Sequence, residues 1–178
     1  MNRKEITNFL NDLLEREKLS GVGKYSAKEV SFDWGTPNAI RVDYMQFVPK
    51  NQLSVSGLEK GIFICYEVKS CKEDFLSGHG KNFIGEKNYL VMTIQTYKEL
   101  KDLGEIDKLP YSIGILCPIC KSFKYKDDKI EKQLLSNKQF DDLNDWYFET
   151  VKSAKEVNRK RSIVEILFSM MRSINRDH

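Results

Sequence analysis

Apolar residues recur with a helical period towards both ends of the chain. Residues 4–18 have apolar residues at the i, i+3, i+4, i+7, i+8 spacing of an amphipathic helix, namely Ile6, Phe9, Leu10, Leu13 and Leu14. The same period returns near the C-terminus, at Ile163, Ile166, Leu167, Met170, Met171 and Ile174. These patterns predict a helix in each region, and we expect most of the chain after about residue 129 to be helical.

Strand patterns fill the middle of the chain. Residues 29–34 and 39–48 alternate between apolar and polar positions, and a turn with Gly35 and Pro37 separates them. Further strands are predicted by the apolar runs at 62–70, 88–94 and 111–117, with 122–126 as one more candidate.

Helical segments separate the later strands. Residues 71–83 suit a short helix followed by a Gly-containing loop, and residues 96–106 suit a helix with Thr96 as N-cap and Gly104 near its end. Strands paired first by hairpins and later linked through helices favour an α/β fold, a mixed β-sheet flanked by helices. We expect a single domain over 1–178, with a core of about 1–130 and a helical C-terminal extension of about 131–178.

Charge and composition exclude few functions. The chain has 29 Lys and Arg against 26 Asp and Glu, and this net charge of +3 neither requires nor excludes nucleic acid. The basic stretch 151–161 could contact phosphate, although a solvated helix face explains it as well. No apolar run approaches the roughly 18 residues of a membrane span, and residues 1–10 lack the apolar stretch of a secretory signal. We therefore expect a cytoplasmic protein that does not contact membranes.

Two charges end the apolar run at 62–70. Glu67 and Lys69 share one face of this predicted strand with Cys65, because side chains alternate along a strand. If the preceding strand forms a hairpin with it, Asp43 lies beside Glu67. Adjacent carboxylates repel each other unless a cation or a proton intervenes, and hard oxygen ligands favour Mg²⁺ or Mn²⁺.

These side chains suffice for metal-dependent hydrolysis of a phosphodiester. A bound ion polarises the phosphate and acidifies a water molecule, and an ammonium can orient that water or stabilise developing charge. The second Glu-x-Lys, at residues 99–101, is expected on a helix, where positions i and i+2 do not share a face. The alternative is an ion pair at the end of the sheet, either Glu67 with Lys69 or Asp43 with Arg41.

The order of several short motifs resembles one family. RVDYMQF and GIFICYEVKSCKEDF, followed by YLVM, Leu109-Pro110 and IGIL, are similar to the Asp and Glu-x-Lys core of the PD-(D/E)XK nuclease superfamily, the restriction-endonuclease-like fold. The branch that it resembles most contains MmcB-type DNA repair proteins and similar phage or prophage proteins. The similarity covers roughly residues 25 to 130. Val42 stands where the superfamily has the Pro that precedes the Asp.

The resemblance implies an active site where the Asp and Glu strands meet. Asp43, Glu67 and the Val68 backbone carbonyl would bind Mg²⁺ or Mn²⁺, and Lys69 would position or activate the attacking water. Related proteins often add a Glu from the first helix or the first strand. Glu29 is our first choice for this residue, and Glu15 and Glu5 are the other candidates.

Residues after the Glu-x-Lys are candidates for phosphate contacts. Ser70 follows the lysine as in the related proteins, and we expect it to cap the next helix as well. His79 and Lys81 lie in the loop beyond that helix, where a phosphate could reach them, although a flexible surface loop is the favoured explanation.

The expected function is a Mg²⁺-dependent nuclease that hydrolyses phosphodiester bonds in DNA, in repair, restriction or phage DNA processing. The alternative is a non-catalytic nucleic-acid-binding or accessory module on the same fold. The sequence leaves open the choice of DNA or RNA, the strandedness of the substrate, the endonuclease or exonuclease mode, and whether the chain forms a homodimer.

Two other motifs have simpler explanations. Cys117 and Cys120 form a C-x-x-C, but zinc would need two more ligands, and Cys65 and Cys71 lack the usual pairing on a tight turn. We expect partly buried thiols, with a zinc-stabilised interaction protein as the alternative. The consecutive aromatic residues 146–148 could stack on bases, but we expect one or two of them to anchor the C-terminal helices in the core.

Overall fold

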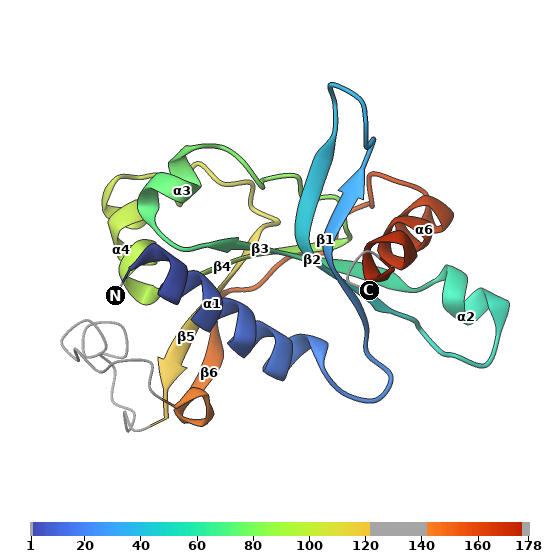
Figure 1. Cartoon of the computed structure of the whole chain (residues 1–178), viewed down its shortest axis with the longest axis horizontal. Coiled ribbons are helices and arrows are strands. Elements are labelled where there is room, and N and C mark those ends of the chain that lie inside the picture. The colour runs from blue at the N-terminus through green and yellow to red at the C-terminus, as the bar shows by residue number, and fades with distance from the viewer. Residues whose placement is uncertain (1, 122–141, 176–178) are drawn as a thin grey trace.

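The computed structural model describes residues 2–121 and 142–175 and contains one six-stranded mixed sheet (Figure 1). The strands lie side by side in chain order: β1 (Tyr25–Phe32), β2 (Ile40–Val48), β3 (Ile62–Lys69), β4 (Lys87–Met92), β5 (Gly114–Cys120) and β6 (Trp146–Lys152). The β3–β4 and β4–β5 pairs are parallel, and the other three pairs are antiparallel. The predicted α/β class is confirmed.

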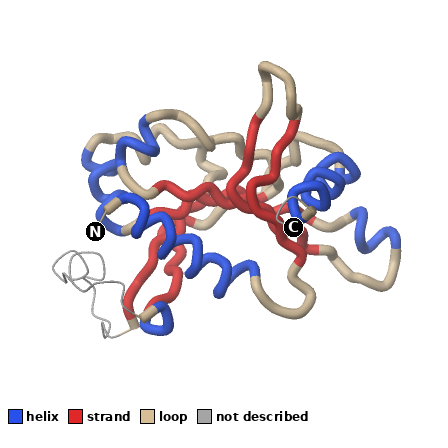
Figure 2. The backbone as a smooth tube through the Cα atoms, viewed as in Figure 1, coloured by secondary structure: helices blue, strands red, loops and turns tan. Residues whose placement is uncertain are grey.

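Helices lie on both sides of this sheet (Figure 2). The described helical segments are α1 (Arg3–Leu14) with its π-helical continuation (Glu15–Leu19), α2 (Val55–Glu59), α3 (Lys72–Leu76), α4 (Ile94–Asp102), a 3₁₀ turn (Leu143–Asp145) and α6 (Ile163–Ile174). None of the described helices is both long enough and apolar enough to span a bilayer.

The apolar stripe of α1 covers one face of the sheet. Leu10, Leu13 and Leu14 are fully buried in a cluster that includes Val68 of β3. Phe9 also belongs to this cluster and meets the ring of Trp146 edge to face, with 5.3 Å between the ring centroids. The predicted core role of residues 146–148 is confirmed for Trp146 and Phe148, which are both buried.

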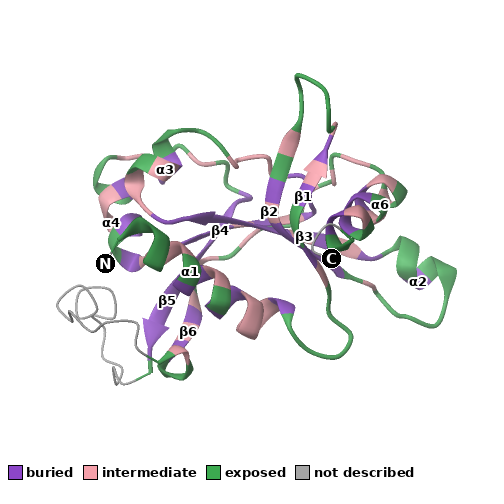
Figure 3. Ribbon diagram, in the orientation of Figure 1, coloured by how far each residue is buried: buried purple, intermediate pink, exposed green. Residues whose placement is uncertain are grey.

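The opposite face is covered by α6 at the β1 end and by α3 and α4 further along. Ile166 and Met170 of α6 join a cluster that includes Phe63 and Cys65 of β3. Both faces of β3 are therefore buried, as the purple central strands in Figure 3 show. Glu67 and Lys69 therefore lie on a covered face of this strand and not on a solvent-exposed one.

The C-terminal segment differs from the prediction. Its last helix is present as α6, but residues 146–152 form β6, which pairs with β5 instead of extending a helix. The basic stretch then runs in an extended conformation, and backbone N–H groups of Lys155, Val157 and Lys160 donate to carbonyls of residues 84–112. It is therefore not a helix face. The strand predicted at 122–126 and the start of the predicted helical region, up to residue 141, lie outside the described residues.

The N-terminus of α4 also differs. The helix begins at Ile94, and its N-cap is Thr93, whose hydroxyl accepts a hydrogen bond from the Thr96 N–H at 3.1 Å. The predicted N-cap, Thr96, instead lies in the first turn, and Gly104 follows the helix with a φ of +70°.

This cap gives a first prediction. Thr93→Ala should lower the free energy of unfolding by about 1 kcal/mol, because it leaves the Thr96 N–H without its acceptor. Urea denaturation measures the change, and exposed Gln95→Ala is the control. Equal midpoints for the two variants would contradict the assignment of the cap.

Candidate active site

The predicted carboxylates lie where β2 and β3 separate. Backbone pairing between these strands ends at Tyr44 and Tyr66, whereas β2 continues to pair with β1 as far as Ile40. The β1–β2 hairpin therefore projects beyond the rest of the sheet (Figure 1). The separation leaves N–H groups of β3 without a backbone partner on β2, and this creates room for side chains.

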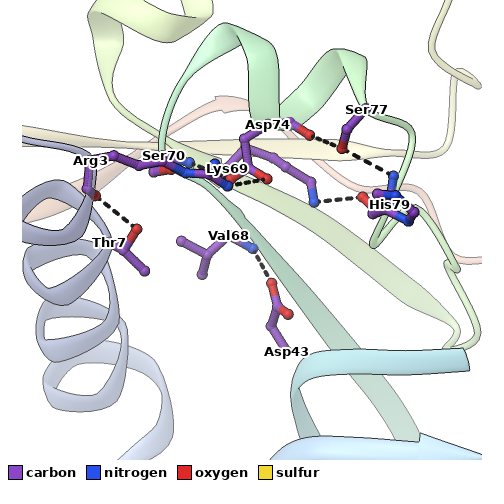
Figure 4. A network of polar contacts seen from close by, with 9 residues as sticks. All are labelled: Arg3, Thr7, Asp43, Val68, Lys69, Ser70, Asp74, Ser77 and His79. Atoms are coloured by element: carbon purple, nitrogen blue, oxygen red, sulfur yellow. Dashed lines mark hydrogen bonds and ion pairs between the residues drawn. The ribbon is translucent and has the colours of Figure 1, made fainter.

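Asp43 occupies the opening between the strands. Its Oδ2 accepts a hydrogen bond from the Val68 N–H at 2.8 Å (Figure 4). The regular alternation of β2 is interrupted here, because Val42 and Met45 belong to the same core cluster although they are three positions apart. Burial raises the pKa of Asp43, while the Val68 N–H and the charge of Lys69 act in the opposite direction. Val68 thus contacts Asp43 through its N–H group. The role of the Val68 carbonyl as a ligand of the metal ion stays a prediction.

Glu67 is the most unusual group of the site. Its side chain has no solvent exposure, and neither carboxylate oxygen meets full hydrogen-bond geometry with a described residue, although the backbone and the carboxyl group of Asp43 lie close enough to affect its pKa. Burial raises its pKa to about 9, the negative charge of Asp43 adds to this shift, and Lys69 opposes it. A buried carboxyl group with two unsatisfied oxygens must hold a proton or be compensated by a cation. This pair of carboxylates therefore fits a hard divalent cation with oxygen ligands.

Lys69 lies on the same side of β3 and is also buried, with 3% of its surface exposed. Its Nζ donates a hydrogen bond to the His79 backbone carbonyl at 2.7 Å (Figure 4). Glu67 and Lys69 converge beneath Gly80, because a Cβ atom at Gly80 would lie 2.7 Å from Glu67 Oε2 and 2.8 Å from Lys69 Nζ. The predicted trio of Asp43, Glu67 and Lys69 is thus brought together.

Ser70 helps to fix the turn between β3 and α3. Its N–H and its hydroxyl both donate to Asp74 Oδ2, at 3.1 and 3.2 Å, and its hydroxyl accepts from Arg3 Nε at 3.1 Å. Arg3 also forms an ion pair with Asp74 at 3.0 Å. Our expectation that Ser70 caps α3 is wrong, because the N-cap position is Cys71.

The loop candidates contribute differently from the prediction. The backbone carbonyl of His79 contacts the site, because it accepts the hydrogen bond from Lys69, but the residue as a whole is exposed. The Nζ of Lys81 lies 3.6 Å from the ring centroid of Phe75, a cation–π contact. The sequence analysis missed the close approach of Gly80, for which the only signal was a pair of glycines on either side of His79.

None of the three glutamates predicted as an additional ligand joins Asp43 and Glu67. Glu29, with a φ of +52°, forms an ion pair with Arg41 at 2.5 Å. The other two candidates also have partners: Glu15 pairs with Lys28, and Glu5 forms the capping box of α1 with Asn2. Within residues 2–121 and 142–175, no group of three or more His, Cys, Asp and Glu residues is placed to hold a metal ion. A cation here would rely on two carboxylates together with backbone or solvent oxygens.

A polar groove of about 930 Å³ leads to this site. It is bounded by α1, the β1–β2 hairpin, the end of β3 and residues 78–82, and Asp43 and Lys69 line it. Three of its cations are paired with carboxylates: Arg3 with Asp74, Lys28 with Glu15, and Arg41 with Glu29. The groove therefore combines both signs of charge around Asp43.

The C-x-x-C pair is not arranged as a zinc site. Cys117 belongs to the cluster beneath α4, whereas Cys120 belongs to the cluster beneath α1, on the opposite face of the sheet. Two ligands on opposite faces of one strand cannot share an ion. Burial also raises the pKa of the Cys117 thiol, which disfavours the thiolate that zinc requires. Both cysteines are fully buried, not partly buried as we expected.

A scan of protein-family models and searches of curated proteins and solved structures found no match to this chain. The site is therefore interpreted from the geometry of its own residues.

Proposed function

We propose that this chain is a metal-dependent nuclease of the PD-(D/E)XK type that hydrolyses phosphodiester bonds in DNA. The supporting observation is the fully buried Glu67 carboxyl group, whose two oxygens meet full hydrogen-bond geometry with none of the described residues, next to Asp43 and Lys69. A buried polar group without partners costs free energy, and such groups are concentrated at functional sites.

Each side chain has a distinct role in this proposal. Asp43 and Glu67 hold Mg²⁺ or Mn²⁺ through their carboxylate oxygens, with the Val68 carbonyl as an additional ligand. When bound, the ion polarises the phosphate and lowers the pKa of a coordinated water. Lys69 orients the attacking water or stabilises charge on the phosphate through N–H groups other than the one that donates to the His79 carbonyl.

The groove offers contacts for a phosphate backbone. Arg3, Lys28 and Arg41 line it around Asp43 and form partly exposed ion pairs, and Arg3 also donates to the Ser70 hydroxyl. Such pairs contribute about 0–1 kcal/mol, so a phosphate can replace the carboxylate partner at small cost. This arrangement supports a polyanionic substrate even though the whole chain has a net charge of only +3.

The direct test is a panel of end-labelled single-stranded and double-stranded DNA and RNA, incubated with Mg²⁺, Mn²⁺ or EDTA. We expect cleavage of DNA in either metal and none in EDTA. Binding of DNA without cleavage in either metal would replace the proposal by the non-catalytic module. Cleavage restricted to RNA would retain the chemistry and correct the substrate.

A further inference from the structure

A strap, defined as residues 77–83, crosses the opening between β2 and β3. On the β2 side, Asn82 Nδ2 donates to the Arg41 carbonyl at 2.7 Å, and Lys160 Nζ donates to the Asn82 carbonyl at 3.1 Å. On the β3 side, the His79 carbonyl accepts from Lys69 at 2.7 Å (Figure 4). The strap is thus bonded to both strands that supply the candidate site.

Gly80 brings the strap into close contact with the site. A Cβ atom at this position would lie 2.7 Å from Glu67 Oε2 and 2.8 Å from Lys69 Nζ, closer than real Cβ atoms approach other atoms. The φ of Gly80 is +62°, which also favours glycine. No larger residue can occupy this position unless the strap or the two side chains move. The space directly over Glu67 and Lys69 is therefore filled by the strap backbone.

The remainder of the strap is suited to movement. Residues 77–79 are exposed, and a Cβ atom at Gly78 would meet nothing within 4 Å. Ser77 and Gly78 are bonded to α3, because the Ser77 hydroxyl donates to the Asp74 carbonyl at 2.8 Å and the Gly78 N–H donates to the Phe75 carbonyl at 3.3 Å. Asn82 anchors the other end. The part of the strap between these anchors, residues 79–81, can therefore move once the Lys69 hydrogen bond and the contact of Lys81 with the Phe75 ring are released.

We propose that the strap is an autoinhibitory cover of the metal site, which must lift from Glu67 and Lys69 before a divalent cation can bind. In the closed arrangement, the His79 carbonyl accepts from one of the three N–H donors of Lys69, and Gly80 blocks the approach to Glu67. The inference rests on the proposed function, and it adds that metal binding and strap opening are coupled. A cation that binds only the open state has an apparent affinity reduced by the fraction of molecules that are open.

Two glycines of the strap provide a matched test. Gly80→Ala introduces a collision with Glu67 and Lys69, so it favours the open strap, whereas Gly78→Ala has a similar backbone strain without a collision. If about one molecule in ten is open in the parent, Gly80→Ala should lower the apparent Kd for Mn²⁺ about tenfold in titration calorimetry. Gly78→Ala should stay within about twofold of the parent. Asn82→Ala removes the hydrogen bond to the Arg41 carbonyl and should also lower the apparent Kd for Mn²⁺. This variant replaces Gly80→Ala in the test if Gly80→Ala does not fold.

Amide hydrogen exchange provides a readout that does not depend on catalysis. Saturating Mn²⁺ should increase exchange of residues 77–83 in the parent and leave it unchanged in Glu67→Gln. One outcome would contradict the autoinhibitory cover and leave the nuclease proposal intact. In it, Mn²⁺ binds the parent without increasing this exchange, and Gly80→Ala and Asn82→Ala bind Mn²⁺ with the same affinity as Gly78→Ala. If neither the parent nor the folded strap variants bind Mn²⁺, the metal site and the cover fail together.

Discussion

Lys69→Met is expected to reduce the rate of Mg²⁺-dependent DNA cleavage by about 10³-fold, the scale of losing one aligned catalytic group. Lys69 is the buried ammonium next to Glu67, and its loss leaves the attacking water and the charge on the phosphate without this donor. Methionine preserves most of the buried side-chain volume, so the effect on packing should be small. Single-turnover cleavage of labelled DNA with the metal in excess measures the chemical step.

The second Glu-x-Lys of the chain supplies the control for this variant. Lys101 is an exposed residue of α4, and Lys101→Met should leave the rate within about twofold of the parent. Circular dichroism and thermal melting establish that both variants are folded. If Lys69→Met cleaves DNA as fast as Lys101→Met, Lys69 has no part in the reaction.

Glu67→Gln is expected to make the metal-free protein more stable, and increasingly so as the pH rises. The pKa of Glu67 is raised from 4.5 to about 9 on folding, so the folded state holds a proton that the unfolded state loses. The stability contributed by this protonated carboxyl is fully present below pH 4.5 and is lost as the pH rises to about 9. Glutamine has no such proton to lose. The free energy of unfolding of Glu67→Gln, relative to that of the parent, should therefore be about 3 kcal/mol greater at pH 8.5 than at pH 6.

Urea denaturation in EDTA at several pH values measures this difference. Glu99→Gln, on the surface of α4, should follow the parent at every pH. Mn²⁺ should raise the melting temperature of the parent more at pH 8.5 than at pH 6, because the ion must displace the proton of Glu67. It should not stabilise Glu67→Gln. Stability curves of Glu67→Gln and parent that run parallel between pH 6 and 8.5 would mean that Glu67 is already ionised without metal.

Side-chain periodicity predicted the parts of the fold that depend on local pattern. The helical period located α1 and α6, and strand alternation placed Glu67 and Lys69 on one face of β3. The strand β6 was missed because its buried positions, Trp146 and Phe148, lie within three consecutive aromatic residues that hide the alternation. Propensity placed the α4 cap at Thr96, because two threonines three positions apart offer equivalent local signals.

The environment of the site depends on tertiary structure that such patterns do not contain. Alternation indicates which face Glu67 occupies, but not that β2 leaves β3 after Tyr44 or that both faces of β3 are covered. The unsatisfied oxygens of Glu67 follow from these two features. Similarly, the glycines on either side of His79 indicate a loop, but they do not indicate that Gly80 packs against two side chains of β3.

The position of α6 has a consequence for the order in which the chain can fold during synthesis. β1 lies at the edge of the sheet, and its Lys28 and Ser31 carbonyls accept hydrogen bonds from Ser173 and Arg172 of α6. The ribosome delivers β1 and β2 early and α6 late, so this edge is open while the nascent chain is being extended. The nascent hairpin is therefore most prone to pair with another chain before α6 emerges, and the last described helix completes the protection of the first strand.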